Sequence, residues 1–314
     1  MQVVMDIGGS NLRIAYLDEN QNLKGVESWS CLKFSGPADA LSTYIEKHKI
    51  DLVSVCIAIA SPLEEDQVTM TNLNWSFSSR ALKDQLSLNT LNIINDYHAM
   101  GFAIPVLGEA EKVQIGGGHV DADKTALLCG PGTGLGVSML ARTENAWLVL
   151  PGEGGHMDFA PTTPYEQEIW HVFHRKYGHV SAERVLSGQG ISDLHAAISE
   201  IDGLDSDVFT AEHISAQALA GKSESCEKTL HMFCSMLGSF CGSLALASAA
   251  FGGVYIGGGI VPRFVDFVKK SGFRDRFEDK GRYRAYNEKI PTFIITAEHP
   301  GLLGAAAYLR QQDV

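Results

Sequence analysis

The chain of 314 residues is long enough for two domains of ordinary size, each with its own hydrophobic core. Its hydrophobic content of 45% and its charged content of 20% exclude a disordered protein. The formal net charge of -12 argues against nucleic acid as a partner, because neutralising many phosphates needs a basic face. It does not argue against a single nucleotide, which needs only local N–H groups, a metal ion and a basic side chain.

Six cysteines occur without a CxxC pair, so neither a disulfide framework nor a zinc ribbon is indicated. We predict a reducing cytosol. Cys234 and Cys241 lie seven residues apart in a helical pattern, which places them on one face and predicts buried core thiols. The first residues carry no basic n-region and lead directly into a strand, which predicts no signal peptide. Residues 235–262 carry no charge and are long enough to span a bilayer. Glycines at 252–253 and 257–259 interrupt them, so we predict a buried helix and a central strand, without membrane contact.

The first predicted elements are two short strands, residues 3–7 and 12–16, joined by a glycine-containing turn. Gly8 and Gly9 let backbone N–H groups point toward an anion, and the turn suits a nucleotide phosphate. Asp6, at the end of the first strand, would place a carboxylate where a hydrated Mg²⁺ beside those phosphates needs one. An ordinary β-hairpin with a glycine turn has the same pattern.

The hydrophobic pattern then predicts a series of strands and helices at residues 26–31 (strand), 37–48 (helix), 52–60 (strand), 78–86 (helix) and 91–94 (strand). Asn95 and Asp96 follow this last strand and begin a helix. Ligands gather at the carboxyl ends of strands in open α/β sheets, which makes the pair a candidate site. Both residue types are also favoured helix N-caps, and a cap residue can face a cleft as well.

A composition shift over residues 105–118 predicts a crossing between two halves, with a boundary near Leu107. A second hairpin follows, with strands at 125–130 and 135–140 around a turn that contains Gly132, Thr133 and Gly134. Two such hairpins far apart in sequence predict a duplicated α/β unit that holds a nucleotide.

Two other nucleotide motifs are excluded by their spacing. A Rossmann fingerprint opens a helix after its glycines, but here a second apolar strand follows. A Walker loop at residues 221–223 would need glycine at position 216, which is Ala216. The preceding stretch is also helical in pattern.

The loop over residues 151–158 carries Glu153 and His156 among three glycines, which expose both side chains. Acceptors and donors at fixed angles are what a sugar needs. A surface turn is the simpler alternative. A metal site is less favoured, because no third ligand of suitable spacing is nearby and His171 and His174 fit an exposed helix face.

The remaining chain is predicted to be mainly helical up to residue 250. Glu183 lies near a helix start, with Ser181 as a candidate cap. A strand over 254–256 leads into a glycine turn whose backbone would lie against an adenosine. A strand over 292–295 and a helix over 300–310 close the chain, and we expect the helix to pack on the first half.

Taken together, these residues resemble the bacterial glucokinases of the actin/hexokinase/heat-shock-ATPase superfamily, nearly from end to end. The resemblance rests on the motifs Asp6-x-Gly-Gly-x-Asn, Ile94-Asn95-Asp96, Gly132-Thr133-Gly134-Leu135-Gly136, Leu150-Pro151-Gly152-Glu153-Gly154-Gly155-His156, His179-Val180-Ser181-Ala182-Glu183-Arg184 and Gly257-Gly258-Gly259-Ile260-Val261-Pro262. It implies an α/β, two-domain actin-like ATPase (ribonuclease H-like) fold, with duplicated mixed sheet units around a central cleft. Ser10 stands where many relatives have threonine, which keeps the hydroxyl. The zinc loop and helix-turn-helix of the related repressor branch are missing, so a transcriptional role loses support.

The resemblance implies a homodimer, Mg-ATP as the phosphoryl donor and Asp96 as the catalytic base. It implies that glucose is held by Asn95, Asp96, Glu153, His156 and Glu183. We predict nucleotide binding by Asp6, Ile7, Gly8, Gly9, Ser10, Asn11, Gly132, Thr133, Gly134 and Gly258. Asp6 is expected to orient Mg²⁺, through water.

We expect a small α/β domain of residues 1–107 with 298–314, and a large α/β domain of residues 108–297. The predicted activity is that of a glucokinase, which converts ATP and D-glucose to ADP and glucose 6-phosphate as the first step of glycolysis. A sugar-sensing protein without turnover is one competitor, but it would not need the carboxylate of Asp96. An ATPase that moves a protein partner is another, but it would not need the sugar-binding cluster.

Overall fold

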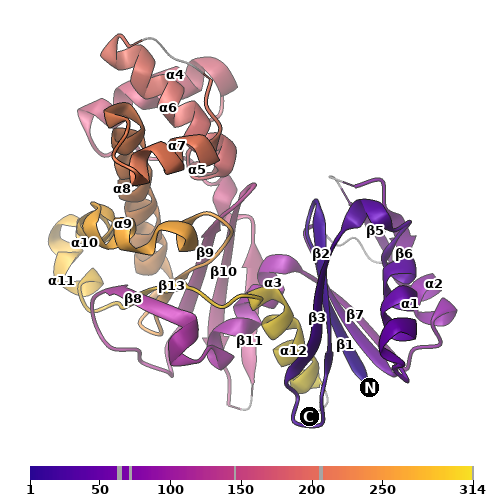
Figure 1. The fold of residues 1–314 in the computed structure, drawn as a ribbon. Helices are drawn as coiled ribbons and strands as arrows, with labels where there is room; N and C mark the ends of the chain where they lie inside the picture. The colour runs from indigo at the N-terminus through magenta and orange to yellow at the C-terminus, as the bar shows by residue number, and fades with distance from the viewer. Residues whose placement is uncertain (62–65, 71–72, 145, 205–207, 313–314) are drawn as a thin grey trace. The chain divides into compact units, whose positions relative to one another are not determined.

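The computed structural model describes residues 1–61, 66–70, 73–144, 146–204 and 208–312. It consists of two compact units (Figure 1). The first unit comprises Met1–Gly108 and Ala297–Val314, and the second comprises Glu109–Thr296. Each unit contains a mixed β-sheet with its own buried core.

The sheet of the first unit has five strands in the order β3-β2-β1-β4-β7. β1 pairs antiparallel with β2 and parallel with β4, and β4 pairs parallel with β7. The predicted opening hairpin and the predicted strand before Asp96 are therefore confirmed. The bounds are β1 Gln2–Ile7, β2 Asn11–Leu17, β3 Leu23–Ser30, β4 Ser54–Ile59 and β7 Thr90–Asn95.

Helices cover both faces of this sheet. Side chains alternate along β1, so that Val3 and Met5 join the core under α1, whereas Val4 joins a second core with Leu302 of α12. The expected packing of the C-terminal helix on the first half is thus confirmed. The bounds are α1 Pro37–His48, α2 Ser79–Gln85, α3 Asp96–Ala103 and α12 Pro300–Gln312, with 3-10 turns η1 Cys31–Lys33 and η2 Ile104–Val106.

One small hairpin in this unit was not predicted. It consists of β5 Gln67–Thr69 and β6 Ser76–Ser78, which pair antiparallel. Strands of three residues are too short to produce a recognisable alternation of apolar and polar residues.

The sheet of the second unit has six strands in the order β11-β10-β9-β12-β13-β8. The first five repeat the pairing of the first unit, with two antiparallel pairs followed by two parallel pairs. The predicted duplication and the second hairpin are therefore confirmed. The bounds are β8 Lys112–Gly116, β9 Ala126–Pro131, β10 Leu135–Arg142, β11 Trp147–Gly152, β12 Val254–Ile256 and β13 Thr292–Ile295.

Strand β8 was not predicted within residues 105–118, which were expected to form a crossing between the two halves. Lys112–Gly116 adds to the edge of the sheet, antiparallel to β13. The strand is only half-buried, and its partner lies far along the chain. A strand specified by a distant partner leaves little local signal.

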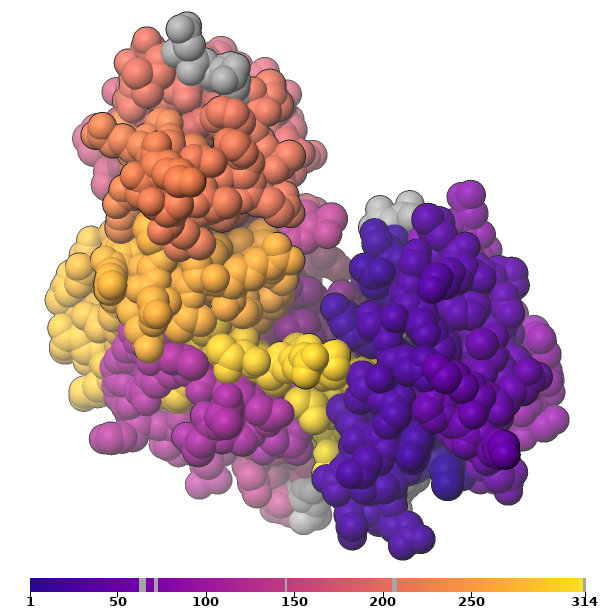
Figure 2. Space-filling model, viewed as in Figure 1, coloured from indigo at the N-terminus to yellow at the C-terminus, as the bar shows by residue number. Residues whose placement is uncertain are grey.

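The helices of the second unit, coloured from pink to golden orange, cover much of that unit on the face drawn in Figure 2. The region up to residue 250 is largely helical, as predicted. The bounds are α4 Pro164–Tyr177, α5 Ala182–Val185, α6 Gly188–Asp202, α7 Ala211–Leu219, α8 Glu224–Ser248, α9 Val265–Lys270, α10 Phe273–Glu278 and α11 Arg284–Asn287, with 3-10 turns η3 Glu109–Glu111, η4 Gly154–His156, η5 Val261–Phe264 and η6 Gly281–Tyr283.

Helix α8 is the one helix of the described ranges that is long and apolar enough to cross a membrane. Most of its apolar window is buried inside the unit, as in the core helix of a globular protein. It ends at Ser248, and β12 then forms a buried strand between β9 and β13. The predicted buried helix and central strand are confirmed. All six cysteines are buried, which confirms the burial predicted for Cys234 and Cys241.

Candidate active site

The carboxyl ends of three neighbouring strands meet at one edge of the first sheet. The parallel register aligns Ile7 with Ile59, and Ile59 with Asn95. Asp6 and the glycine turn therefore lie at the same edge as Asn95 and Asp96. The sheet brings the first predicted phosphate turn together with the predicted catalytic pair, where ligands of such sheets bind.

The glycine turn between β1 and β2 is closed by its own backbone. The Gly8 N–H donates to the Asn11 carbonyl (3.0 Å), and the Cys31 N–H donates to the Ser10 carbonyl (2.9 Å). Ser10 and Asn11 are exposed, so a ligand can reach them. A Cβ at Gly8 would meet the Asn11 oxygen at 3.4 Å, which is an ordinary contact. Packing within the turn therefore does not require glycine at position 8. The absence of a side chain there instead lets a ligand approach the backbone closely.

Asn95 is the N-cap of α3. Its Oδ1 accepts hydrogen bonds from the N–H groups of Tyr97 (2.9 Å) and His98 (3.2 Å). Asp96 is the first residue of the helix, and its Oδ1 also accepts from the Tyr97 N–H (2.9 Å). Helix capping is thus the structural role of Asn95, as the capping interpretation of the sequence predicted.

The carboxylates of Asp6 and Asp96 lie near each other at this edge, and the charge of Asp6 affects the pKa of Asp96. The pKa of Asp96 is raised to about 6, first because burial disfavours its charged form and second because the charge of Asp6 is nearby. The hydrogen bond from Tyr97 opposes this shift. Burial also raises the pKa of Asp6, although Arg13 acts in the opposite direction. A carboxylate with a pKa near neutrality is suited to accept a proton during a reaction.

Two neighbours of Asp6 were not predicted from the sequence. Nη1 of Arg13 lies 3.3 Å from Oδ2 of Asp6, because the hairpin register places these residues opposite each other. Pairing the two strands residue by residue across the turn would have revealed this contact. The backbone of α12 at Gly301 also lies against the Asp6 carboxylate, and no local pattern predicts that contact.

In the second unit, the turn between β9 and β10 lies next to the helix that carries Glu183. The Gly188 N–H donates to the Gly132 carbonyl, and the Leu135 N–H donates to Oε2 of Glu183, both at 2.8 Å. A Cβ at Gly134 would lie 2.5 Å from the same carboxylate oxygen, so the close approach requires glycine. The structure thus places Glu183 on the second predicted phosphate turn.

Glu153 and His156 project from the loop that follows β11. The Glu153 side chain is 84% exposed and that of His156 is 62% exposed, which confirms the predicted exposure. Oε2 of Glu153 and Nε2 of His156 are 3.9 Å apart. A β-bridge between Asp158 and Ser181 attaches this loop to the start of α5. Glu153, His156 and Glu183 are therefore carried by adjoining segments of one unit.

The turn after β12 lies directly on the end of β9. Gly258 has a φ of +81°, and a Cβ there would lie 2.3 Å from the Pro131 carbonyl oxygen. Only glycine combines this backbone conformation with such a close contact. Gly258 is thereby placed beside the turn that begins at Gly132.

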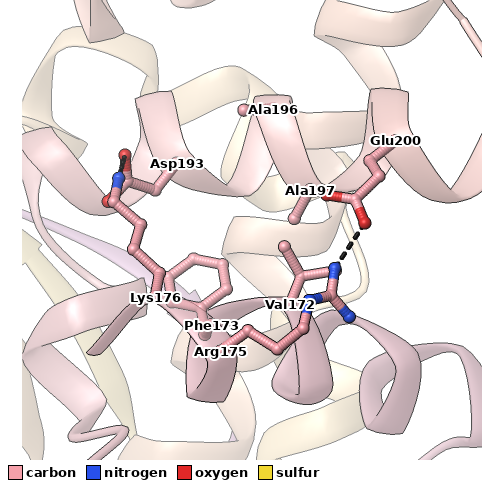
Figure 3. A pocket seen from close by; sticks show the side chains of 8 residues that line it. All are labelled: Val172, Phe173, Arg175, Lys176, Asp193, Ala196, Ala197 and Glu200. Atoms are coloured by element: carbon pink, nitrogen blue, oxygen red, sulfur yellow. Dashed lines mark hydrogen bonds and ion pairs between the residues drawn. The ribbon is translucent and has the colours of Figure 1, made fainter. Parts of the chain in front are cut away.

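A surface pocket of about 550 Å³ lies between α4 and α6 (Figure 3). It is lined by Val172, Phe173, Arg175, Lys176, Asp193, Ala196, Ala197 and Glu200, and none of these is a predicted site residue. Of the predicted glucose-binding residues, Asn95 and Asp96 belong to the first unit, and the other three belong to the second.

Solved structures define the class of this fold. A glucokinase from an Antarctic psychrotroph has a TM-score of 0.90 and 36% sequence identity, covering 99% of this chain and 98% of that chain. A ROK family glucokinase from Streptomyces griseus, solved in complex with glucose and AMPPNP, has a TM-score of 0.65 and 18% identity over 99% of both chains, which is a likeness of fold alone. The fold is that of the two-domain, actin-like sugar kinases.

Sequence comparison narrows the class to one family. A family model described as Glucokinase matches residues 3–312. The curated glucokinase of Colwellia psychrerythraea is 44% identical over 318 residues, covering 99% of this chain and 96% of that protein. The chain belongs to the glucokinase family, and the resemblance inferred from its motifs is confirmed.

Proposed function

We propose that this chain is an ATP-dependent glucokinase that phosphorylates D-glucose at its 6-hydroxyl, the first step of glycolysis. The observation that carries the proposal is a partly buried carboxylate, Asp96, at the same sheet edge as the phosphate turn of a glucokinase-family chain. The relatives are named glucokinases, and a solved structure of the same fold holds glucose and an ATP analogue.

Asp96 accepts the proton of the attacking 6-hydroxyl and orients that oxygen toward the γ-phosphate. Asn95 binds the sugar through its amide nitrogen, because its oxygen caps α3. Glu153, His156 and Glu183 bind the ring hydroxyls. Their carboxylate and imidazole groups supply the hydrogen-bonding partners that distinguish one hexose from another.

The glycine turns of both units bind the nucleotide. The N–H groups of Gly8 and Gly132 donate to carbonyls within their own turns, so other backbone N–H groups of these turns bind the phosphates, and the backbone at Gly258 lies against the adenosine. The described ranges contain no cluster of three or more His, Cys, Asp or Glu residues able to hold a metal ion. An Mg²⁺ ion that arrives with ATP fits this donor set, because it keeps several waters and needs only one or two protein carboxylates.

Asp6 suits that ion because it is an oxygen donor whose burial, without a cation, disfavours its charge. When bound, Mg²⁺ neutralises charge on the phosphates. Arg13 holds the Asp6 carboxylate in place through its 3.3 Å contact.

We further propose that the active form is a cytoplasmic homodimer that binds neither nucleic acid nor membranes. The net charge of -12 supports the absence of nucleic acid, and the burial of α8 supports the absence of a membrane span. We propose residues 1–107 with 298–314 and residues 108–297 as the functional domains. Analytical ultracentrifugation tests the dimer, and a single species of one-chain mass would refute it.

The proposed substrate is tested by coupled ADP release across a panel of hexoses. Glucose should give the highest kcat/KM, and ADP release without sugar should be slow, because water is a poor substitute for a positioned hydroxyl. Equal rates with and without sugar would instead indicate an ATPase. Tight glucose binding without ADP release would indicate a sugar sensor.

Acidification should reduce activity, because Asp96 must be ionised to accept a proton. Its pKa is raised to about 6, so kcat/KM for glucose should be constant above that pH and fall about tenfold for each pH unit below it. A pH profile at saturating ATP measures this. A rate that stays constant well below pH 6, with the protein still folded, would contradict the role of Asp96 as the base.

Replacing Glu153 should affect the sugar and spare the nucleotide. Glu153→Ala removes a charged hydrogen-bond acceptor, so kcat/KM for glucose should fall by about 10- to 100-fold while the KM for ATP changes little. Glu212→Ala, an exposed change on α7, is the matched control and should have no effect. Loss of ATP binding with glucose binding retained would refute the assignment of Glu153.

A further inference from the structure

Glu183 is carried by a helix too short to hold itself in place. Helix α5 has four residues, Ala182–Val185, and an isolated segment of that length has no helical stability of its own. The Ala182 N–H donates to the Met157 carbonyl (2.8 Å), and Ser181 caps the helix. The position of Glu183 therefore depends on contacts with the elements around α5.

A nearly buried carboxylate joins the two longer helices that flank α5. Asp193 of α6 accepts hydrogen bonds from Lys176 Nζ (2.8 Å), from Gln189 Nε2 (2.9 Å) and from the hydroxyl of Tyr177, the last residue of α4. Figure 3 shows Asp193 and Lys176 meeting across the space between the helices. The bonds from Lys176 and Tyr177 join the end of α4 to α6, and the segment 178–187 between these two helices contains α5.

A stacking contact continues from this carboxylate to α5. The guanidinium of Arg184 lies over the ring of Tyr177, 4.2 Å from its centroid. Burial alone would raise the pKa of Asp193, but its hydrogen bonds and the charge of Lys176 outweigh burial and lower that pKa. Asp193 is therefore charged at neutral pH and, being only 9% exposed, depends on all three donors.

We propose that Asp193 is a positioning residue for Glu183. It orients the hydroxyl of Tyr177, the Tyr177 ring supports Arg184, and Arg184 fixes the helix that presents the neighbouring Glu183 to the sugar. This inference rests on the proposed function, since Glu183 binds glucose only if glucose is the substrate. In this proposal, Asp193 affects the recognition of glucose without contacting the sugar itself.

Asp193→Asn tests this proposal, with Glu200→Gln as the matched control. Arg175 and Glu200 form a second ion pair between the same two helices, also drawn in Figure 3, but Glu200 is 58% exposed and does not adjoin α5. Asp193→Asn should raise the KM for glucose about tenfold, with kcat and the KM for ATP within about twofold of the parent. Glu200→Gln should change none of these values.

Tyr177→Phe is the second variant, and it keeps the ring that supports Arg184 while removing the hydroxyl. It should give a smaller rise in the glucose KM, and it is used if Asp193→Asn does not fold. Hydrogen exchange provides a readout without substrate. The amides of residues 181–186 should exchange faster in both variants, and their exchange should be unchanged in Glu200→Gln.

Two outcomes would overturn the proposal: an unchanged glucose KM in folded Asp193→Asn, or equal rises in both KM values. If the parent does not phosphorylate glucose, the proposed function fails, and the exchange data then report on the contact with α5 alone. Unchanged exchange at residues 181–186 refutes that contact in either case.

Discussion

Asp96→Asn should reduce kcat for glucose phosphorylation by about 10²–10⁴-fold, the usual cost of removing a general base. Asparagine has nearly the same shape and can still accept the hydrogen bond from Tyr97 (2.9 Å), so α3 should keep its start. Asn95, which provides the cap, is unchanged. The loss should therefore appear in the chemical step, measured as kcat at saturating glucose and ATP.

The stability of this variant provides an independent check. Because the folded pKa of Asp96 is raised to about 6, the folded state holds its proton more tightly than the unfolded state does. The free energy of unfolding of the parent should thus fall as pH rises from about 4 to about 6 and stay lower above that. The asparagine side chain of the Asp96→Asn variant cannot ionise, so the variant should be at least as stable as the parent at neutral pH.

Asp84→Asn on α2 is the control for this experiment, because Asp84 is exposed and distant from the sheet edge. It should leave both kcat and stability unchanged. A folded Asp96→Asn protein with a turnover within a few-fold of the parent would leave the base unidentified.

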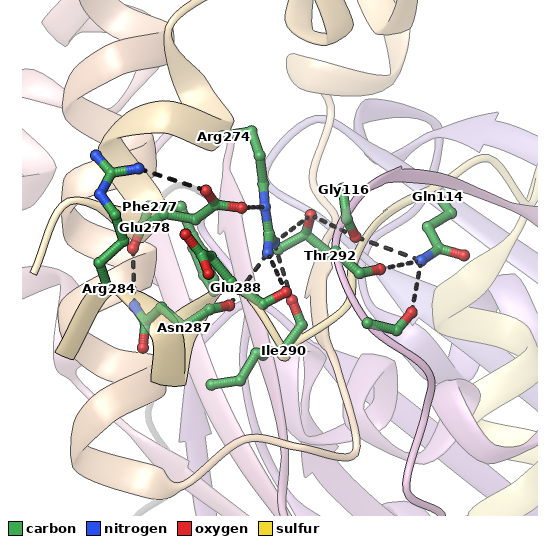
Figure 4. A network of polar contacts seen from close by, with 12 residues as sticks. Gln114, Gly116, Arg274, Phe277, Glu278, Arg284, Asn287, Glu288, Ile290 and Thr292 are labelled. Atoms are coloured by element: carbon green, nitrogen blue, oxygen red, sulfur yellow. Dashed lines mark hydrogen bonds and ion pairs between the residues drawn. The ribbon is translucent and has the colours of Figure 1, made fainter.

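Arg274→Ala should lower the free energy of unfolding of the second unit by about 3–5 kcal/mol. The guanidinium of Arg274 donates to Ile290 O (2.9 Å), Thr292 Oγ1 (3.2 Å), Asn287 O (3.1 Å) and Glu288 O (3.1 Å) (Figure 4). Without it, these acceptors lose their donor in a partly buried site. The network ties α10 to the turn that leads into β13, so urea denaturation should show the loss.

Arg284→Gln is the control for Arg274→Ala. Arg274 and Arg284 both contact the Glu278 carboxylate, but the Arg274 side chain is 17% exposed and that of Arg284 is 47% exposed. Removing the exposed partner should cost less than about 1 kcal/mol. Equal effects of the two substitutions would mean that the contacts of Arg274 with backbone oxygens contribute little.

The elements that the sequence predicted well are those whose signal is local. The opening hairpin alternates between two cores along β1, and α1 begins at Pro37 and ends at His48, as predicted. Asn95 was expected to follow a strand and begin a helix, and the structure has it as the N-cap of α3. Periodicity, proline and capping residues act over a few positions, so they can be recognised without the fold.

The features that the sequence did not predict depend on distant partners. Strand β8 is specified by pairing with β13, and the network of Arg274 joins segments that no periodicity connects. Likewise, Gly301 reaches Asp6 only because α12 packs on the first sheet. The hydrogen bond from the Leu135 N–H to the Glu183 carboxylate likewise joins residues that are far apart in the sequence. Such contacts follow from tertiary packing, which local propensity does not encode.

The most direct test of the proposed activity is identification of the product. The purified chain is incubated with Mg-ATP and glucose, and the sugar phosphate is identified by phosphorus and proton NMR. The expected result is glucose 6-phosphate formed in equal amount with ADP, at a rate that Asp96→Asn reduces by about 10²-fold or more. ADP formed without any sugar phosphate, or a phosphate on another hydroxyl, would contradict the proposed reaction.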